Sequence, residues 1–234
     1  MVTPDVIYPV RAGVGEYLRY SLRSLDNVPH GEVVLSGFSP SWATCRRLKG
    51  ARDYNSFIDS SNNAMRAMQD ESLTDDVIWM MDDVYILRPM EQIPVLHRGE
   101  LERVIKSYGA GARSRYLMNM QRTLDLLREL GIGDPLCYEL HVPLMVNRHA
   151  YQQLREVLPA SGKLWEYSRR TLYGNLNNIG GEKSQDVKVT SKNTHVPAGR
   201  FVSSSATSWH GRVGRGVRLT FPHPCKWEKP VNPS

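Results

Sequence analysis

Val77-Ile78-Trp79-Met80-Met81-Asp82-Asp83-Val84-Tyr85-Ile86-Leu87 is the stretch that decides the fold. An apolar run enters two adjacent carboxylates and then resumes, which is typical of a buried parallel strand that ends just before Asp82. In open α/β sheets, ligands bind at the carboxyl ends of such strands. Two carboxylates there are costly to desolvate unless a positive group meets them, and Mg²⁺ typically takes one or two carboxylates plus phosphate oxygens. The pair therefore predicts a metal and diphosphate site, although an isolated Asp-Asp is more often a solvated turn.

The composition is that of an ordinary globular protein with room for one α/β core, since 41% of the 234 residues are hydrophobic and 23% are charged. No apolar run is long enough to cross a bilayer, and the first residues lack the features of a signal peptide. The three cysteines, Cys45, Cys137 and Cys225, are scattered. This spacing argues against a disulfide framework and a zinc site, and it favours a cytoplasmic protein.

The net charge of +6 favours phosphate-rich partners, which include both nucleotides and nucleic acid. The basic excess leans toward the end of the chain. After residue 200 only Glu228 offsets a set of five basic residues: Arg212, Arg215, Arg218, Lys226 and Lys229. A solvated basic segment and a phosphate-facing role are equally compatible with this pattern.

Strands and helices are predicted to alternate along the chain, and this order favours a parallel sheet with right-handed crossovers. We expect strands at 5–10, 32–37 and 75–81, and helices at 16–25, 55–70, 116–130 and 148–157. Residues 135–146 are expected to be extended, and Gly131 to cap the preceding helix. Residues 175–205 are rich in Gly, Ser, Asn and Lys, which predicts long loops over the active face.

Several well-known motifs are absent. Gly13-x-Gly15 lacks the third glycine of a dinucleotide loop, and there is no P-loop, no Gly-x-Ser-x-Gly elbow and no His-Glu-x-x-His. These absences weaken the dehydrogenase, NTPase, serine hydrolase and zinc protease interpretations.

Isolated residues suggest chemistry without establishing it. Arg19 and Arg23 lie four apart on one predicted helix and Arg11 precedes them, and guanidinium forks suit phosphate, although such residues are more often solvated. His141 lies inside an extended apolar segment, where it can serve as a general base, although a hydrogen-bonded core histidine is commoner. Arg169–Asn175 combines paired arginines, an aromatic ring and a turn, which alone indicates a helix end.

Taken in order, these segments resemble the Stealth family of sugar-phosphate transferases. That family includes bacterial capsular polysaccharide phosphotransferases and the catalytic subunit of the lysosomal-enzyme N-acetylglucosamine-phosphotransferase. The strongest match is the helix block Leu18–Leu25, and the others are Asp5–Tyr8, Asn55–Ser56, Asn62–Ala64, Met81–Ile86, Glu139–Pro143, Phe201–Val202 and Phe221–Glu228. The arrangement is also similar to small bacteriophage and actinobacterial proteins loosely described as glycosyltransferases.

The sequence departs from the family pattern at three places. Pro9-Val10-Arg11-Ala12-Gly13 replaces the Trp-Val-Asp/Asn-Gly turn, Ser203-Ser204-Ser205-Ala206 replaces an Asn-Asp pair, and Met81 replaces an asparagine. These substitutions are compatible with plain glycosyl transfer in place of sugar-phosphate transfer.

The resemblance implies one catalytic α/β domain over residues 1–234, with a mostly parallel, GT-A-like sheet flanked by helices and long C-terminal loops. Residues 1–90 would form the nucleotide-donor half, and residues 91–234 the acceptor half with its closing loops. Asp82 and Asp83 would bind Mn²⁺ or Mg²⁺, with Asp83 also catalytic, and His141 would be the general base. Arg11, Arg19, Arg23, Asn62, Asn63 and Arg170 would bind the donor, and Tyr173 and Asn175 the acceptor.

The implied reaction is metal-dependent transfer of a sugar or sugar 1-phosphate from a nucleotide sugar, a UDP-sugar foremost, to an acceptor hydroxyl. The acceptor would be a hydroxymethylated DNA base, a glycan or a virion protein, in the bacterial host cytoplasm if the chain is phage-encoded. The alternative is a non-catalytic nucleic-acid- or carbohydrate-binding protein on the same fold, which the altered turn and last block favour. A nuclease is a weaker alternative, because two-metal sites recruit further carboxylates.

Overall fold

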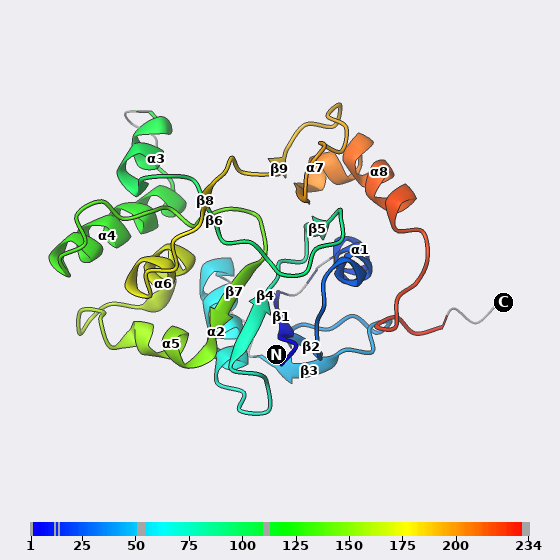
Figure 1. Ribbon diagram of the computed structural model, residues 1–234, viewed down its shortest axis with the longest axis horizontal. Helices are drawn as coiled ribbons and strands as arrows, with labels where there is room; N and C mark the ends of the chain where they lie inside the picture. The colour runs from blue at the N-terminus through cyan, green and yellow to red at the C-terminus, as the bar shows by residue number, and fades with distance from the viewer. Residues whose placement is uncertain (1, 12, 14, 51–54, 110–112, 231–234) are drawn as a thin grey trace. The chain divides into compact units, whose positions relative to one another are not determined.

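Five strands form the central sheet of the computed structural model, in the order β3-β2-β1-β4-β7 (Figure 1). β1 (Asp5–Val10) pairs in parallel with β2 (Val33–Gly37) and with β4 (Asp76–Trp79). β3 (Arg46–Lys49) adds in parallel to the far side of β2, and β7 (Leu144–Asn147) completes the order next to β4. The predicted mixed α/β fold with a mostly parallel central sheet is confirmed.

The described residues are 2–11, 13, 15–50, 55–109 and 113–230, and they divide into two compact units. The first unit comprises Met1–Ile93, His141–Val146 and Val187–Ser234, and the second comprises Pro94–Leu140 and Asn147–Asp186. The chain therefore leaves the first unit twice and returns to it twice. The division of the chain into donor and acceptor halves stays a prediction.

Two helices follow the first strands, as the periodicity predicts. α1 (Tyr17–Ser24) continues into a 3₁₀ turn over Leu25–Asn27, and it buries its leucines. α2 (Ser56–Met68) packs on β1 and β2 through an apolar face that includes Ala64, Met65 and Met68. The side chain of Asn55 accepts a hydrogen bond from the Phe57 amide at 3.0 Å, which fixes where α2 begins.

The stretch 77–87 contributes one strand to the central sheet and another to a second, smaller sheet. β4 ends at Trp79, and β5 (Val84–Ile86) then pairs antiparallel with β10 (Phe201–Ser204), with Val202 opposite Tyr85. β9 (Lys188–Val189) pairs in parallel with the other edge of β10. Asp82 and Asp83 thus occupy the turn that connects the two sheets.

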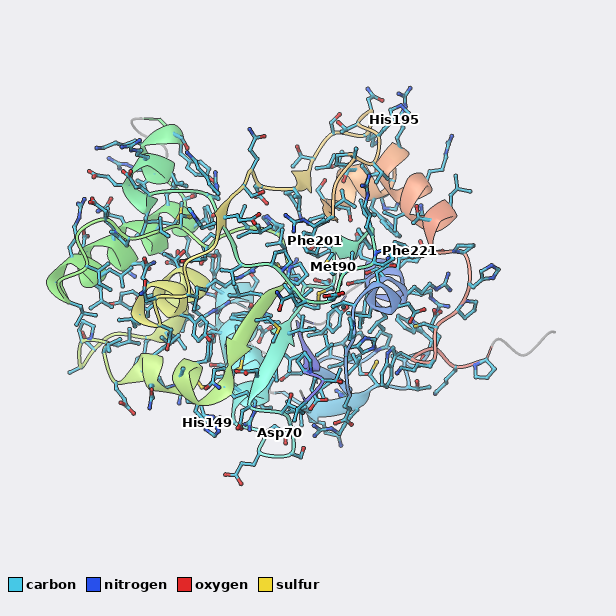
Figure 2. All side chains as sticks on the ribbon, viewed as in Figure 1. Asp70, Met90, His149, His195, Phe201 and Phe221 are labelled. Carbon is cyan, nitrogen blue, oxygen red and sulfur yellow. The ribbon has the colours of Figure 1, made fainter. Side chains whose placement is uncertain are left out.

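The prediction of long loops over 175–205 was wrong for part of that segment. It contains β8 (Glu182–Lys183), β9 and the fully buried β10, on which Phe201 is labelled in Figure 2. Two further helices, α7 (Ala206–Trp209) and α8 (Arg212–Thr220), follow β10 and were not predicted. They bury Trp209, Val213 and Val217 in a cluster with aromatic and aliphatic residues of α1, β5 and β10.

The second unit is mostly helical. Its helices are α3 (Leu101–Ser107), α4 (Arg115–Glu129), α5 (Arg148–Gln152) and α6 (Arg169–Leu176), with 3₁₀ turns at Gln153–Arg155 and Leu164–Glu166. β6 (Leu96–His97) pairs in parallel with β8. Gly131 has φ +86°, so it caps α4 in the left-handed conformation, as predicted. Within the predicted extended segment 135–146, only residues 144–146 belong to a named strand, β7.

Among the residues that the structure describes, no helix combines the length and the apolar character required to cross a bilayer.

Candidate functional site

Asp82 and Asp83 lie just beyond the carboxyl end of β4, which the sheet order places between β1 and β7. Both side chains are partly buried. Burial and the neighbouring charge of Asp83 together raise the pKa of Asp82 to about 6, against the opposing effects of Arg11 and Lys188. Desolvation and the neighbouring carboxylate therefore outweigh the cationic groups that act on Asp82.

The backbone and side chain of Asp83 are both held by the second sheet. Its carboxylate forms an ion pair with Lys188 of β9, and its carbonyl accepts a hydrogen bond from the Ser204 amide at 3.0 Å. The hydroxyls of Ser204 and Tyr85 are hydrogen-bonded at 3.0 Å. Lys188 was missed by sequence reasoning, because only the pairing of β9 with β10 brings it to this turn.

The packing of α2 on the sheet brings Asn63 close to the end of β1. Its amide nitrogen donates to the carbonyl of Val10 at 3.1 Å, and its oxygen accepts from Arg66 at 3.1 Å. A Cβ at Gly37, which has φ +106°, would collide with the Asn63 amide and the Val10 carbonyl. Glycine at the end of β2 is thus required by the close approach of α2.

The predicted donor residues near this edge differ in their availability. Asn62 is exposed, whereas Asn63 is buried and already hydrogen-bonded on both sides of its amide. Arg11 is exposed directly after β1, and its charge acts on Asp82. Arg11 and Asn62 can therefore contact a ligand without rearrangement, and a donor role for Asn63 stays a prediction.

Arg19 and Arg23 meet a partner from the far end of the chain. Arg19 Nη1 donates to Glu228 Oε2 at 2.8 Å, and Arg23 donates through Nε and Nη2 to the two Glu228 oxygens at 2.6 and 3.0 Å. Arg23 Nη1 also reaches the carbonyls of Phe221 and Pro222 at 2.9 and 3.2 Å. The helix block and the last block of the resemblance are therefore joined to each other.

The charges of Arg19 and Arg23 are paired with Glu228 within the protein, so no ligand is needed to account for them. Burial alone would raise the pKa of Glu228, but the hydrogen bonds from Arg23 and from the Cys225 amide hold it below its ordinary value. The guanidinium of Arg19 also lies over the Trp42 ring at 4.5 Å. A role for Arg19 and Arg23 in binding the donor remains a prediction. In the structure both side chains form ion pairs with Glu228.

Arg170, Tyr173 and Asn175 belong to the second unit, on α6. Arg170 is buried and donates to the Leu140 carbonyl at 2.6 Å, and desolvation lowers its pKa to about 10. The Tyr173 hydroxyl accepts from the Asn147 amide at 2.8 Å. Asn175 bridges the Leu136 amide and carbonyl, each at 2.7 Å. All three thus organise the second unit, and their predicted donor and acceptor contacts remain predictions.

His141 belongs to the first unit, three residues before β7 begins, and its side chain is partly buried. Its position next to a strand of the central sheet keeps it a candidate. A role as general base stays a prediction.

The donor chemistry of the turn fits a hard divalent cation. Within the described ranges, no cluster of three or more His, Cys, Asp or Glu side chains could surround a metal ion. Mg²⁺ needs fewer protein ligands, because it completes its octahedron with phosphate oxygens and water. Asp82 and Asp83 are therefore sufficient protein ligands only if a diphosphate supplies the others.

Comparison with models of known protein families found no match to this chain, and comparison with curated proteins found none either. Function must therefore be argued from the residues of the site.

Proposed function

We propose that this chain is a metal-assisted transferase with a GT-A-like sheet, which moves a sugar or sugar 1-phosphate from a nucleotide sugar to an acceptor hydroxyl. The observation that carries the proposal is the position of Asp82 and Asp83 beyond a central strand of a mostly parallel sheet, with Arg11 and Lys188 acting on Asp82. Ligands of open α/β sheets bind at such strand ends. An acidic pair flanked by cationic groups suits a cation together with a diphosphate.

Each residue has a stated task in this proposal. Asp82 and Asp83 hold Mn²⁺ or Mg²⁺, which when bound neutralises charge on the leaving diphosphate. Arg11, exposed at the end of β1, binds a phosphate oxygen, and the exposed amide of Asn62 binds the nucleoside or the sugar. His141 accepts the proton of the acceptor hydroxyl. Arg19 and Arg23 support the site from the scaffold through Glu228.

The state of Asp82 sets a pH limit on this proposal. Because its pKa is raised to about 6, the carboxylate is mostly ionised at about pH 7 and mostly protonated at about pH 5. A protonated carboxyl is a poor ligand for a hard cation. We therefore expect metal-dependent donor binding to weaken as the pH falls through about 6.

The test is thermal stabilisation by a panel of nucleotide sugars, with Mn²⁺, with Mg²⁺ and with EDTA. A ligand that binds only the native state raises stability in proportion to the logarithm of its concentration over its Kd, which is about 2.7 kcal/mol at about 100 times Kd. The wild type is compared with Asp83→Asn, which removes the charge but keeps the shape. Asp75→Asn is the matched control, because Asp75 is an exposed aspartate just before the amino end of β4.

A metal-dependent shift with one donor, lost in Asp83→Asn and retained in Asp75→Asn, supports the transferase. If no donor shifts the folded wild type with either metal, the transferase proposal fails. The alternative, a non-catalytic binding protein, is favoured by the ion pair of Lys188 with Asp83, which partly neutralises the turn without a metal. That alternative predicts ligand-induced shifts that EDTA does not change.

A further inference from the structure

The net positive charge of this chain arises in one segment. Residues 187–227 contain seven Lys and Arg and no Asp or Glu, so this segment exceeds the net charge of the entire chain, which is +6. The segment belongs to the first unit and includes β9, β10, α7 and α8. Such a one-signed segment on a folded surface is the electrostatic pattern of a polyanion-binding protein.

α8 carries three of these basic residues on a regular helical surface. Arg212, Arg215 and Arg218 recur at intervals of three, a spacing that places neighbouring side chains on the same side of a helix. Arg212 and Arg215 are exposed, and Arg218 is partly exposed. Val213 and Val217, on the other side of α8, are fully buried. The helix therefore presents its arginines outward while its apolar side is used in the core.

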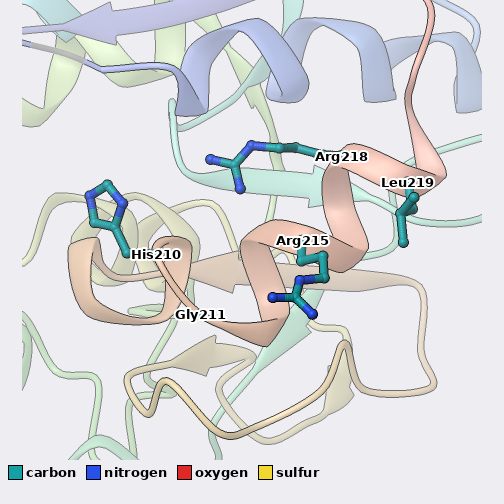
Figure 3. Close-up of a pocket in the computed structure, with 5 residues that line it drawn as sticks. All are labelled: His210, Gly211, Arg215, Arg218 and Leu219. Atoms are coloured by element: carbon teal, nitrogen blue, oxygen red, sulfur yellow. The ribbon is translucent and has the colours of Figure 1, made fainter.

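A pocket lies beside these arginines, at the junction of α7 and α8. It is open, has a volume of about 340 Å³, and is lined by His210, Gly211, Arg215, Arg218 and Leu219. In the view of Figure 3, the Arg218 side chain extends from α8 toward the side of His210, whereas the Arg215 side chain extends in a different direction from the same helix. The lining of the pocket thus includes two arginines and a histidine.

The positions of the three guanidinium groups are set by different contacts. Arg218 lies over the Trp209 ring at 4.2 Å and pairs with Glu16 at 2.7 Å. Arg212 donates to Nε2 of His195, which Figure 2 labels, at 2.7 Å. Within the described part of the chain, Arg215 forms no ion pair. Arg215 is therefore ready to receive an anionic group.

We propose that the surface formed by His210, Arg212, Arg215 and Arg218 binds the phosphate backbone of nucleic acid. Guanidinium groups bind phosphate oxygens through paired N–H donors, and phosphate contacts supply most non-specific nucleic-acid affinity. In this proposal Arg215 binds a phosphate at the pocket, Arg212 on the same helix binds a neighbouring phosphate, and Arg218 adds positive charge beside them. This surface is separate from Asp82 and Asp83, and the proposal does not depend on the transferase.

An anionic membrane is the less favoured partner. A helix that lies in a membrane interface needs a free apolar face to insert. The apolar face of α8 is occupied, since Val213 and Val217 pack with Trp209 in the core of the first unit. Leu219 is the large apolar side chain that α8 leaves exposed, and a single one is too little for stable insertion.

The test is fluorescence anisotropy with a labelled mixed-sequence DNA duplex of about 20 base pairs, titrated from about 50 to about 200 mM NaCl. The wild type is compared with the double variant Arg212→Gln/Arg215→Gln. Arg88→Gln/Arg155→Gln is the matched control, because it removes two exposed arginines elsewhere. Arg215→Lys tests whether charge alone suffices, and thermal melting of each variant verifies that it is folded.

We expect the wild type to bind with an affinity that falls steeply with salt. The double variant should bind about tenfold more weakly at low salt, with a log–log salt slope smaller by about 2, because each phosphate contact contributes about 0.9. Equal binding by the double variant and the control would overturn the assignment of the surface. Absence of DNA binding by the folded wild type would overturn the proposal, as would binding only to phosphatidylserine vesicles.

Discussion

Two acidic positions of the first unit, Glu228 and the Asp82–Asp83 turn, differ in how far neighbouring groups stabilise the ionised carboxylate. Glu228 accepts hydrogen bonds from Arg19, from two nitrogens of Arg23 and from the Cys225 amide, and its pKa is lowered despite burial. Asp82 is desolvated next to another carboxylate, and its pKa is raised. A carboxylate with a full set of hydrogen-bond and ion-pair partners stabilises the fold, whereas a desolvated carboxylate with a raised pKa is a candidate for a functional site. The difference separates scaffold from candidate site.

The largest expected effect comes from breaking the saturated site. Glu228→Gln leaves Arg23 buried without its counter-charge, and the Arg23 and Glu228 side chains are only 8% and 1% exposed. Removing one partner of a buried pair typically lowers the free energy of unfolding by about 3–5 kcal/mol, and we expect the lower end because glutamine keeps one hydrogen-bond acceptor. Urea unfolding measures the change.

The control for that prediction is Glu32→Gln, which weakens a half-exposed pair with Arg46 at 2.9 Å. Exposed pairs contribute about 0.2–1 kcal/mol, so the two variants should differ several-fold. If both variants lost a similar free energy of unfolding, Glu228 would stabilise the fold no more than a surface carboxylate does. The proposed difference between Glu228 and Asp82 would then be wrong.

A smaller effect of opposite sign is expected at the turn. Asp82 has a folded pKa of about 6 against an ordinary value of 3.8, so the folded state holds a proton that the unfolded state has lost between these pH values. Ionised Asp82 therefore destabilises the metal-free protein above about pH 6, and this loss vanishes below about pH 4. Asp82→Asn should raise the free energy of unfolding by about 1–2 kcal/mol at about pH 7, and should change it little at about pH 4.

Chemical denaturation of wild type and Asp82→Asn across that pH range, with EDTA, measures the difference. Adding Mn²⁺ and the donor identified by thermal stabilisation should reverse the order, because only the wild type gains binding energy. A destabilised Asp82→Asn at about pH 7 without metal would show that the turn is already neutralised, and that Asp82 resembles Glu228.

The smallest effect is expected for Lys188→Gln. The Lys188 and Asp83 side chains are 21% and 24% exposed, so solvent screens their ion pair and its loss should change the free energy of unfolding by less than about 1 kcal/mol. Lys188 also lowers the pKa of Asp82, so the variant should raise it further. NMR titration of the Asp82 carboxyl checks this, and an unchanged pKa would remove Lys188 from the electrostatics of the site.

The elements that sequence reasoning predicted well are those whose pattern is local. β1, β2 and β4 are apolar runs because helices cover the sheet, and α2 begins at a capping asparagine. β3 was missed, since three of the four residues in Arg46–Lys49 are basic and the strand lies at the edge of the sheet, where its exposure alternates. β10 was missed because its pairing with β5 joins segments more than a hundred residues apart, and no local periodicity encodes such a contact.

The candidate site shows the same division. Asp82 and Asp83 could be located from the apolar run around them, and Arg11 from its place after the first strand. The partners could not: Lys188 reaches Asp83 across 105 residues, and Glu228 reaches Arg23 across 205. The spacing of Arg19 and Arg23 suggested contact with phosphate. The structure shows that a carboxylate distant in sequence, Glu228, already pairs with both guanidinium groups.

The link between α1 and Glu228 also constrains how the chain folds as it is made. Synthesis proceeds at about 5–20 residues per second, so about 10–40 seconds separate the emergence of Arg23 from that of its counter-charge. During that interval the first strands and α1 can assemble, but the two arginines must stay hydrated. The pairing of Arg19 and Arg23 with Glu228 therefore waits for the last described segment, so the docking of that segment on α1 is a late step of biosynthetic folding although α1 is translated early.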